Sequence, residues 1–123
     1  MDPQLKRGLL DICVLAVLQR ADSYGYKIIK DASAVLEITE STLYPILKRL
    51  EQAKCLTVYS VEHNGRLRKY YSITELGRQR VIDFLHEWDA MMKIYEYIKE
   101  GQKTVSYTHL DVYKRQTYQR RLH

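Results

Sequence analysis

The stretch "ESTLYPILKRLE", residues 40–51, carries hydroxyl, aromatic and basic side chains at helical spacing. Its aliphatic residues follow the i, i+3, i+4, i+7 pattern of an amphipathic helix: Leu43, Ile46, Leu47 and Leu50. Four other side chains fall outside this apolar stripe: Ser41, Thr42, Tyr44 and Lys48. Hydroxyl and N–H groups at the start of a helix suit contacts with phosphates or base edges, and lysine neutralises phosphate charge. The segment therefore offers chemistry for binding phosphates.

Each of these side chains also has a purely structural interpretation. Ser41 and Thr42 can cap the helix without touching any ligand. Tyr44 can lie in the core, because tyrosines are buried readily. Lys48 and Arg49 can form a solvated helix face. The residue types alone leave both interpretations open.

Pro45 restricts where this helix begins. A proline lacks the backbone N–H and clashes with the carbonyl group four residues earlier, which costs about 3 kcal/mol in a helix interior and much less in the first turn. We therefore expect the helix to begin close to Pro45, with Thr39 or Ser41 as its N-cap, and to end near residue 53.

The chain of 123 residues is long enough for one domain with a modest core, extended by a dimer interface. The longest strictly apolar run, residues 12–18, is far too short to span a bilayer. The N-terminus lacks the layout of a signal peptide. We expect a cytoplasmic protein that does not enter the membrane.

The positive charge is concentrated at the C-terminal end. The whole chain has a formal net charge of +5, but residues 1–101 hold 15 Lys and Arg against 14 Asp and Glu, a net of +1. Residues 102–123 hold 5 and 1, a net of +4. Only local clustering of basic residues in the first part of the chain can therefore support binding to nucleic acid.

The sequence offers no catalytic or metal-binding pattern. Cys13 and Cys55 are far apart and form no CxxC motif, and Cys13 lies in an apolar helical run where a buried, reduced thiol is expected. His63 and His86 lack metal-ligand spacing, and there is no glycine-rich phosphate loop. We expect no metal, no cofactor and no enzymatic activity.

Two helices are expected before the proline-bearing one. Residues 4–20 are apolar nearly all round in the middle, which is typical of a core helix. Ser23 can cap a second helix that ends near residue 34.

Residues 56–73 change to a period of two around Asn64-Gly65, a strong hairpin signal because a type I′ turn needs positive φ at both central positions. This turn predicts the register of the two strands: Leu56 opposite Ile73, Val58 opposite Tyr71, Tyr59 opposite Tyr70, Ser60 opposite Lys69 and Val61 opposite Arg68. One face should be apolar and cover the helices. The other carries aromatic and basic side chains: Tyr59, His63, Arg66, Arg68 and Tyr70. Arg66 and Arg68 can contact DNA or simply deter pairing at a strand edge.

A long helix is expected from Thr74 to about residue 100. Its apolar residues form a seam with alternating spacings of four and three: Val81, Leu85, Trp88, Met92 and Tyr95. A second strip adds Phe84, Met91, Ile94 and Ile98. So broad an apolar surface usually packs on a partner helix, so we expect a homodimer. The expected organisation is a winged-helix domain at 1–73, a dimerisation helix at 74–101 and a non-native or disordered tail at 102–123.

Part of the tail, residues 102–123, resembles a product of DNA sequencing rather than a natural protein sequence. Residues 106–116, "SYTHLDVYKRQ", are what one obtains by translating a nearly palindromic DNA sequence that resembles two transposon-end sequencing adapters joined head to head. We hypothesise that the native reading frame is interrupted near Val105, and we exclude the residues after it from the expected fold. The alternative is a natural basic tail.

Three helices followed by a two-stranded ribbon describe a winged helix-turn-helix, a mainly α fold with a small β-hairpin. Within that class, "STLYPILKRLE", a hairpin and then "GRLRKYYSITELGR" resemble the PadR family of transcriptional regulators over about residues 4–100. The resemblance implies a bacterial repressor that binds a palindromic double-stranded DNA operator as a homodimer, with the C-terminal helix crossing to the other subunit. The alternative is a winged-helix module that binds proteins without binding DNA.

The resemblance also implies a set of DNA-binding residues, on the third helix and on the wing: Ser41, Thr42, Tyr44, Lys48, Arg66, Arg68, Lys69 and Tyr70. One position departs from the family pattern, since Lys54 stands where the family often has a glycine after the recognition helix. Glycine there would suit a left-handed C-cap, so we expect this helix end to be strained or shaped differently.

Trp88 is the only tryptophan of the chain. The resemblance implies that a central aromatic residue on the dimer helix can line a cavity that accepts a small planar aromatic or hydrophobic effector, and Met91 and Met92 would suit such an adaptable pocket. The alternative is ordinary interface packing, because tryptophan is enriched at interfaces.

Overall fold

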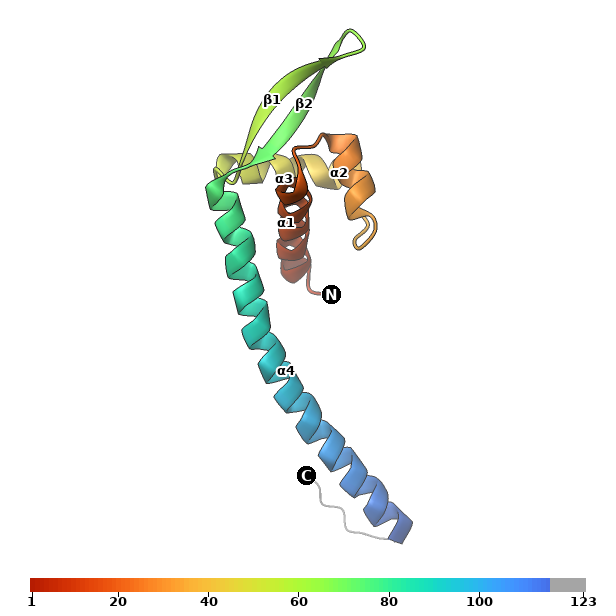
Figure 1. Cartoon of the computed structure of the whole chain (residues 1–123). Helices are drawn as coiled ribbons and strands as arrows, with labels where there is room; N and C mark the ends of the chain where they lie inside the picture. The colour runs from red at the N-terminus through yellow and green to blue at the C-terminus, as the bar shows by residue number, and fades with distance from the viewer. Residues whose placement is uncertain (116–123) are drawn as a thin grey trace. The chain divides into compact units, whose positions relative to one another are not determined.

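The computed structural model describes the backbone of residues 1–115 and the side chains of residues 1–102. Its elements follow one another as α1 (Pro3–Arg20), α2 (Gly25–Ala32), α3 (Glu40–Gln52), β1 (Leu56–His63), β2 (Arg66–Ile73) and α4 (Glu75–Arg115) (Figure 1). Two compact units are distinguished, Met1–Phe84 and a second that begins at Leu85. Among the described residues, no helix is long and apolar enough to cross a membrane.

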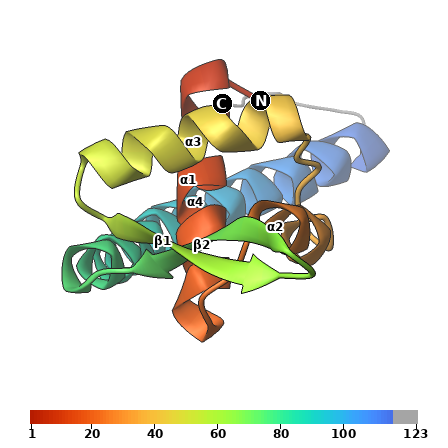
Figure 2. The ribbon, with the colours of Figure 1, turned by 90° about the horizontal axis from the view of Figure 1, so that it is seen from above.

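The first unit has a core that all its elements share. α1, α2 and α3 pack against one another, and the hairpin follows the C-terminal end of α3 (Figure 2). The largest fully buried side chains come from the three helices and the start of β1: Val14, Leu15, Leu18, Ile28, Leu43, Leu47, Leu50 and Leu56. The apolar stripe predicted for the third helix therefore faces this core, and the winged-helix fold class is confirmed.

α2 begins later than the sequence suggested. Ser23 is not its N-cap, because Tyr24 takes that position. The backbone of Ser23 instead pairs with β2, with its N–H 3.2 Å from the Tyr71 carbonyl and its carbonyl accepting from the Tyr71 N–H at 2.7 Å. The helix ends at Ala32, with Ser33 as its C-cap. The prediction for Ser23 was wrong because pairing with a distant strand competed with local capping.

The hairpin has the predicted register throughout. Leu56 lies opposite Ile73, Tyr59 opposite Tyr70, and the other predicted pairs are confirmed as well. Asn64 and Gly65 adopt φ values of 53° and 78°, as a type I′ turn requires. The turn therefore determines which side chains of the wing face the helices.

α3 ends in a Schellman motif at a non-glycine residue. The N–H of Cys55 donates to the Leu50 carbonyl at 2.9 Å, and the N–H of Lys54 donates to the Glu51 carbonyl at 2.9 Å. Lys54 has a φ of 63°, in the left-handed region that favours glycine. The unusual helix end expected at Lys54 is thus confirmed as a left-handed C-cap with a side chain.

The start of α4 is attached to that helix end. The Thr74 hydroxyl donates to the Lys54 carbonyl at 2.7 Å and accepts from the Gly77 N–H at 3.1 Å. A Cβ atom at Gly77 would overlap the Cys55 carbonyl oxygen, so only glycine permits this close approach. Thr74 is therefore the helix start that the sequence predicted, and it joins α3 to α4.

α4 extends to Arg115, beyond the end expected near residue 100. The described backbone is helical over residues 102–115, where the sequence had no clear period. The adapter hypothesis for residues 106–116 concerns the origin of the coding sequence and stays a prediction. Gln116 and the side chains from residue 103 onward lie outside the described residues.

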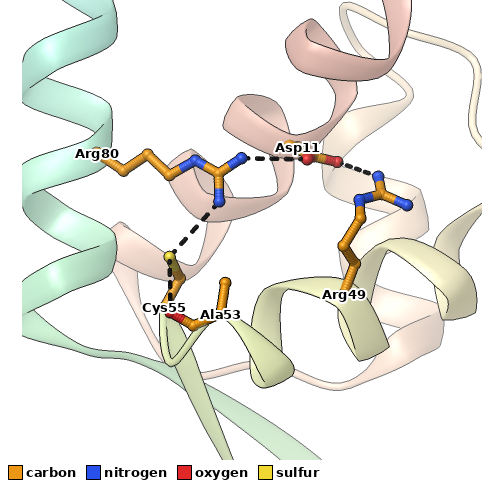
Figure 3. A network of polar contacts seen from close by, with 5 residues as sticks. All are labelled: Asp11, Arg49, Ala53, Cys55 and Arg80. Carbon is orange, nitrogen blue, oxygen red and sulfur yellow. Dashed lines mark hydrogen bonds and ion pairs between the residues drawn. The ribbon is translucent and has the colours of Figure 1, made fainter.

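A buried carboxylate joins α1, α3 and α4 (Figure 3). Asp11 is 4% exposed and is unexpected in an apolar helix. Its two oxygens accept from Arg49 at 2.6 Å and from Arg80 at 3.4 Å. Arg80 also donates to the Cys55 sulfur at 3.6 Å. We call Asp11, Arg49, Arg80 and Cys55 the Asp11 network.

Replacing Lys54 by glycine should stabilise the protein. A left-handed conformation costs an L-residue roughly 1–2 kcal/mol, which the extra freedom of glycine in the unfolded chain partly offsets, so we expect a net gain of about 0.5–1 kcal/mol. Urea denaturation at one fixed protein concentration measures it. Gln52→Gly is the matched control, because Gln52 is helical and exposed and its replacement should lower stability. Equal losses in both variants would contradict the assignment of strain to Lys54.

Candidate nucleic-acid interface

The outer side of α3 presents the hydroxyl and basic residues. Ser41 and Lys48 are exposed and Thr42 is half-buried, whereas the apolar stripe on the other side of the helix is buried. Thr39 is the N-cap, and its hydroxyl lies 3.0 Å from that of Ser41 and 3.2 Å from that of Thr42. Ser41 and Thr42 are therefore first-turn residues rather than caps, with their hydroxyls grouped on the outer side.

Lys48 and Arg49, adjacent in sequence, have different roles. Lys48 lies on the exposed side of α3. Arg49 turns toward Asp11 and forms the shortest ion pair of the Asp11 network. The Arg49 side chain is 39% exposed, so the interpretation as part of a solvated face holds only in part: its guanidinium is paired with Asp11, because a buried carboxylate requires a charged partner.

Tyr44 is partly exposed and partly packed. Its side chain is 46% exposed. A Cβ atom added at Gly25 would overlap the Tyr44 hydroxyl, so the start of α2 supports the ring closely. Neither the core nor the surface interpretation holds alone: the ring rests on α2 while much of it stays accessible.

The basic residues of the wing divide into two groups. Arg66 and Lys69 are exposed. Arg68 is half-buried, with its guanidinium carbon 4.0 Å from the centre of the Tyr24 ring, a cation–π contact. Tyr70 is also half-buried. Arg66 and Lys69 thus extend outward, whereas Arg68 and Tyr70 are held against the domain.

Tyrosines attach the wing to the segment before α2. The Tyr70 ring lies 5.3 Å from Tyr24 and 5.7 Å from Tyr59, measured between centroids. The Tyr59 hydroxyl donates to Asp22 at 2.7 Å, and this hydrogen bond raises the pKa of Tyr59. Burial raises the pKa of the neighbouring Tyr71 phenol. We call Tyr24, Tyr59, Tyr70, Arg68 and Asp22 the tyrosine cluster.

A concave surface lies between α2, α3 and the wing. A cavity of about 530 Å³ is lined by residues of all three, among them Tyr24, Tyr26, Tyr44, Arg68 and Lys69. It brings together three of the predicted DNA-binding residues from two separate elements. Tyr24 and Tyr26 were missed as site residues. The sequence feature that could have indicated them is the pair of tyrosines on either side of Gly25, at the start of α2.

The apolar seam of α4 begins later than the sequence indicated. Val81 is 5% exposed and belongs to the core of the first unit, so the winged-helix domain itself occupies it. The other predicted interface residues are accessible in the single chain: Leu85, Trp88, Met92 and Tyr95. Met91, proposed to line an effector pocket, is 51% exposed.

Cys13, expected to be buried, is only half-buried, and burial raises the pKa of its thiol.

A three-helix domain with a hydroxyl-bearing third helix and a two-stranded wing defines a winged helix-turn-helix protein. Residues 14–83 match the Transcriptional regulator PadR-like family. The chain belongs to this family, whose members are transcriptional regulators and not enzymes.

Solved structures of relatives have the same fold. The smu.1704 protein of Streptococcus mutans UA159 is 41% identical, with a TM-score of 0.69 over 77% of this chain and 90% of that one. A PadR-like transcription factor from Bacteroides fragilis is 31% identical, with a TM-score of 0.70 over 77% and 94%. Bacillus subtilis PadR, solved in complex with operator DNA, is 24% identical, with a TM-score of 0.57 over 63% and 45%. This last likeness concerns the fold alone.

Removing the Asp22 carboxylate should lower the pKa of Tyr59 toward the ordinary tyrosine value of about 10. The raised pKa means that the folded protein favours the protonated phenol of Tyr59. The hydrogen bond therefore stabilises the fold at any pH below the pKa of Tyr59 in the unfolded chain, and this stabilisation is lost as the pH rises through the pKa of Tyr59 in the folded protein. A pH titration of ¹³Cζ-labelled tyrosine by NMR should show one resonance shifted to lower pKa in Asp22→Asn. Asp31→Asn, at an exposed ion pair with Lys27, should leave it unchanged.

Proposed function

We propose that this regulator is a repressor that binds a palindromic double-stranded DNA operator as a homodimer. One observation carries the proposal: Tyr44 of α3 and Arg68 and Lys69 of the wing line one concave surface. A winged helix reads DNA from such a surface, with its third helix in the major groove and the wing against the backbone or the minor groove.

Each candidate residue has a role that follows from its position. Ser41 and Thr42, in the first turn of α3, would contact base edges or phosphates in the groove. Lys48 further along the same helix, with Arg66 and Lys69 on the wing, would neutralise phosphates. Tyr44 and Arg68 would contact the sugar–phosphate backbone from the concave surface, and Tyr70 would contact it from the wing. The complex would form in the cytoplasm, where bacterial DNA is found.

Dimerisation through α4 explains its exposed apolar side chains. Leu85, Trp88, Met92 and Tyr95 repeat at spacings of three and four and are 36–54% exposed in the single chain. A helix with such a seam is stable in water when it packs on a second helix. Two copies related by a two-fold axis would then meet an operator with the same symmetry.

Trp88 with Met91 and Met92 is the place on the proposed dimer helix where a small planar apolar effector would bind. The aromatic ring offers a flat apolar surface, and the methionines can adapt to different ligand shapes. Release of the operator on binding such a ligand would make the repressor inducible.

Selection from randomised duplex DNA at near-physiological salt tests the proposed function. The full chain and a chain of residues 1–101 should enrich the same two-fold symmetric site, because the basic tail contributes only non-specific affinity. A folded dimer that enriches no site would contradict DNA recognition and support a protein-binding winged helix.

Charge removal should change the salt dependence of binding to the selected site. Arg66→Ala or Lys48→Ala removes one phosphate interaction per subunit and should reduce the slope of log K against log salt by about 1 for each phosphate no longer neutralised. Fluorescence anisotropy over a salt series measures this slope. Lys30→Ala is the matched control, because Lys30 is an exposed lysine in the last turn of α2. An unchanged slope in both site variants would refute these assignments.

A further inference from the structure

Asp11 is buried, and its surroundings are unusual for a carboxylate. It lies on the apolar helix α1, close to core residues such as Leu10 and Val14. A buried charge costs several kcal/mol unless charged partners compensate for it. Arg49 and Arg80 provide that compensation, and each binds a different oxygen of the carboxylate. Because the partners come from α3 and α4, the carboxylate constrains two helices at once.

The two arginines belong to helices with different tasks. Arg49 follows Lys48 directly on the helix proposed to enter the major groove. Arg80 lies in the second turn of α4, the helix whose later residues carry the apolar seam. Arg80 also reaches the Cys55 sulfur, directly after the left-handed end of α3 (Figure 3). The Asp11 network therefore connects α3 to the first turns of α4. It is a second polar connection, beside the hydrogen bond between Thr74 and Lys54.

The angle between these helices matters in a dimer that reads two half-sites. Half-sites lie about 34–36 Å apart, one turn of DNA, so the two recognition helices must be separated by the same distance. A change in the angle at which α4 leaves α3 would change that separation in a two-fold symmetric dimer.

We propose that Asp11, Arg49 and Arg80 are positioning residues that set the half-site spacing the dimer accepts. They need not touch DNA. By holding α3 against the first turns of α4, they restrict the distance between the two recognition helices of the dimer. The inference rests on the proposed function, because it requires a two-fold symmetric operator.

Affinity for a series of operators with altered spacing tests the proposal. The two half-sites of the selected operator are kept, and one base pair is inserted or deleted between them. We expect the wild-type dimer to lose about tenfold or more in affinity on either change. Arg80→Met removes the hydrogen bonds of Arg80 to both Asp11 and Cys55 and should reduce this loss to about threefold or less, since looser helices tolerate either spacing.

A purely structural role would give a different result. Ile28→Val removes a methyl group from a fully buried side chain of α2, outside the network, and serves as the control for lost stability. Lower stability alone reduces the affinity for all operators by the same factor. The ratio of the affinity for the selected operator to the affinity for an operator with altered spacing should therefore stay at the wild-type value in this control. Asp11→Asn should lower the ratio as Arg80→Met does. If it does not fold, Arg80→Met decides, because Arg80 has a side chain 42% exposed and its loss leaves Asp11 paired with Arg49.

Two failures can be told apart. If wild type selects no symmetric operator, the proposed function fails and this inference fails with it. If wild type discriminates spacing and folded Arg80→Met discriminates it equally well, the inference alone is overturned. A lowered ratio in Arg80→Met together with a wild-type ratio in Ile28→Val supports it.

Discussion

Burial of one side of α3 is the constraint on which the arrangement of the winged-helix domain depends. Its four aliphatic side chains are all buried, and each contributes roughly 2 kcal/mol by leaving water. Rotating the helix to hide Ser41 or Lys48 would expose that stripe. The outward direction of the candidate DNA-binding side chains is therefore fixed by the core, although none of them contributes to it. Pro45 is the sixth residue of α3 and lies inside the helix, so the Ser41 carbonyl has no N–H partner four residues later.

The hairpin was the part of the fold most completely predictable from the sequence. Asn64-Gly65 fixes both the turn type and the strand register, and a register error of one residue would have moved every side chain to the wrong face. Local rules were sufficient there because the two strands are neighbours in the sequence. The apolar period of α3 and the helix start at Thr74 were predictable for the same reason.

Interactions between distant segments were not predictable in this way. Ser23 has the residue type of a cap, but its backbone pairs with Tyr71 far along the chain. Arg49 looked like a surface residue because its partner, Asp11, lies on another helix within an apolar run. Val81 has the spacing of the apolar seam of α4, but its side chain is buried in the core of the first unit. Arg68 lies on the same strand face as another basic residue, Arg66. Of the two, only Arg68 stacks on the Tyr24 ring, and the sequence did not show that Tyr24 would lie there.

The tyrosine cluster has a consequence for how the wing can act. A hairpin joined to a domain only at its base is free to move, and ordering it on DNA would cost conformational entropy. Here Tyr70 packs between Tyr24 and Tyr59, and Asp22 holds the Tyr59 hydroxyl. Stacking on Tyr24 likewise restricts the Arg68 side chain before any ligand arrives. The wing therefore begins from a restricted position relative to α2, and less of its contact energy is lost in ordering it. This explains why tyrosines, rather than further lysines, occupy the base of a basic wing.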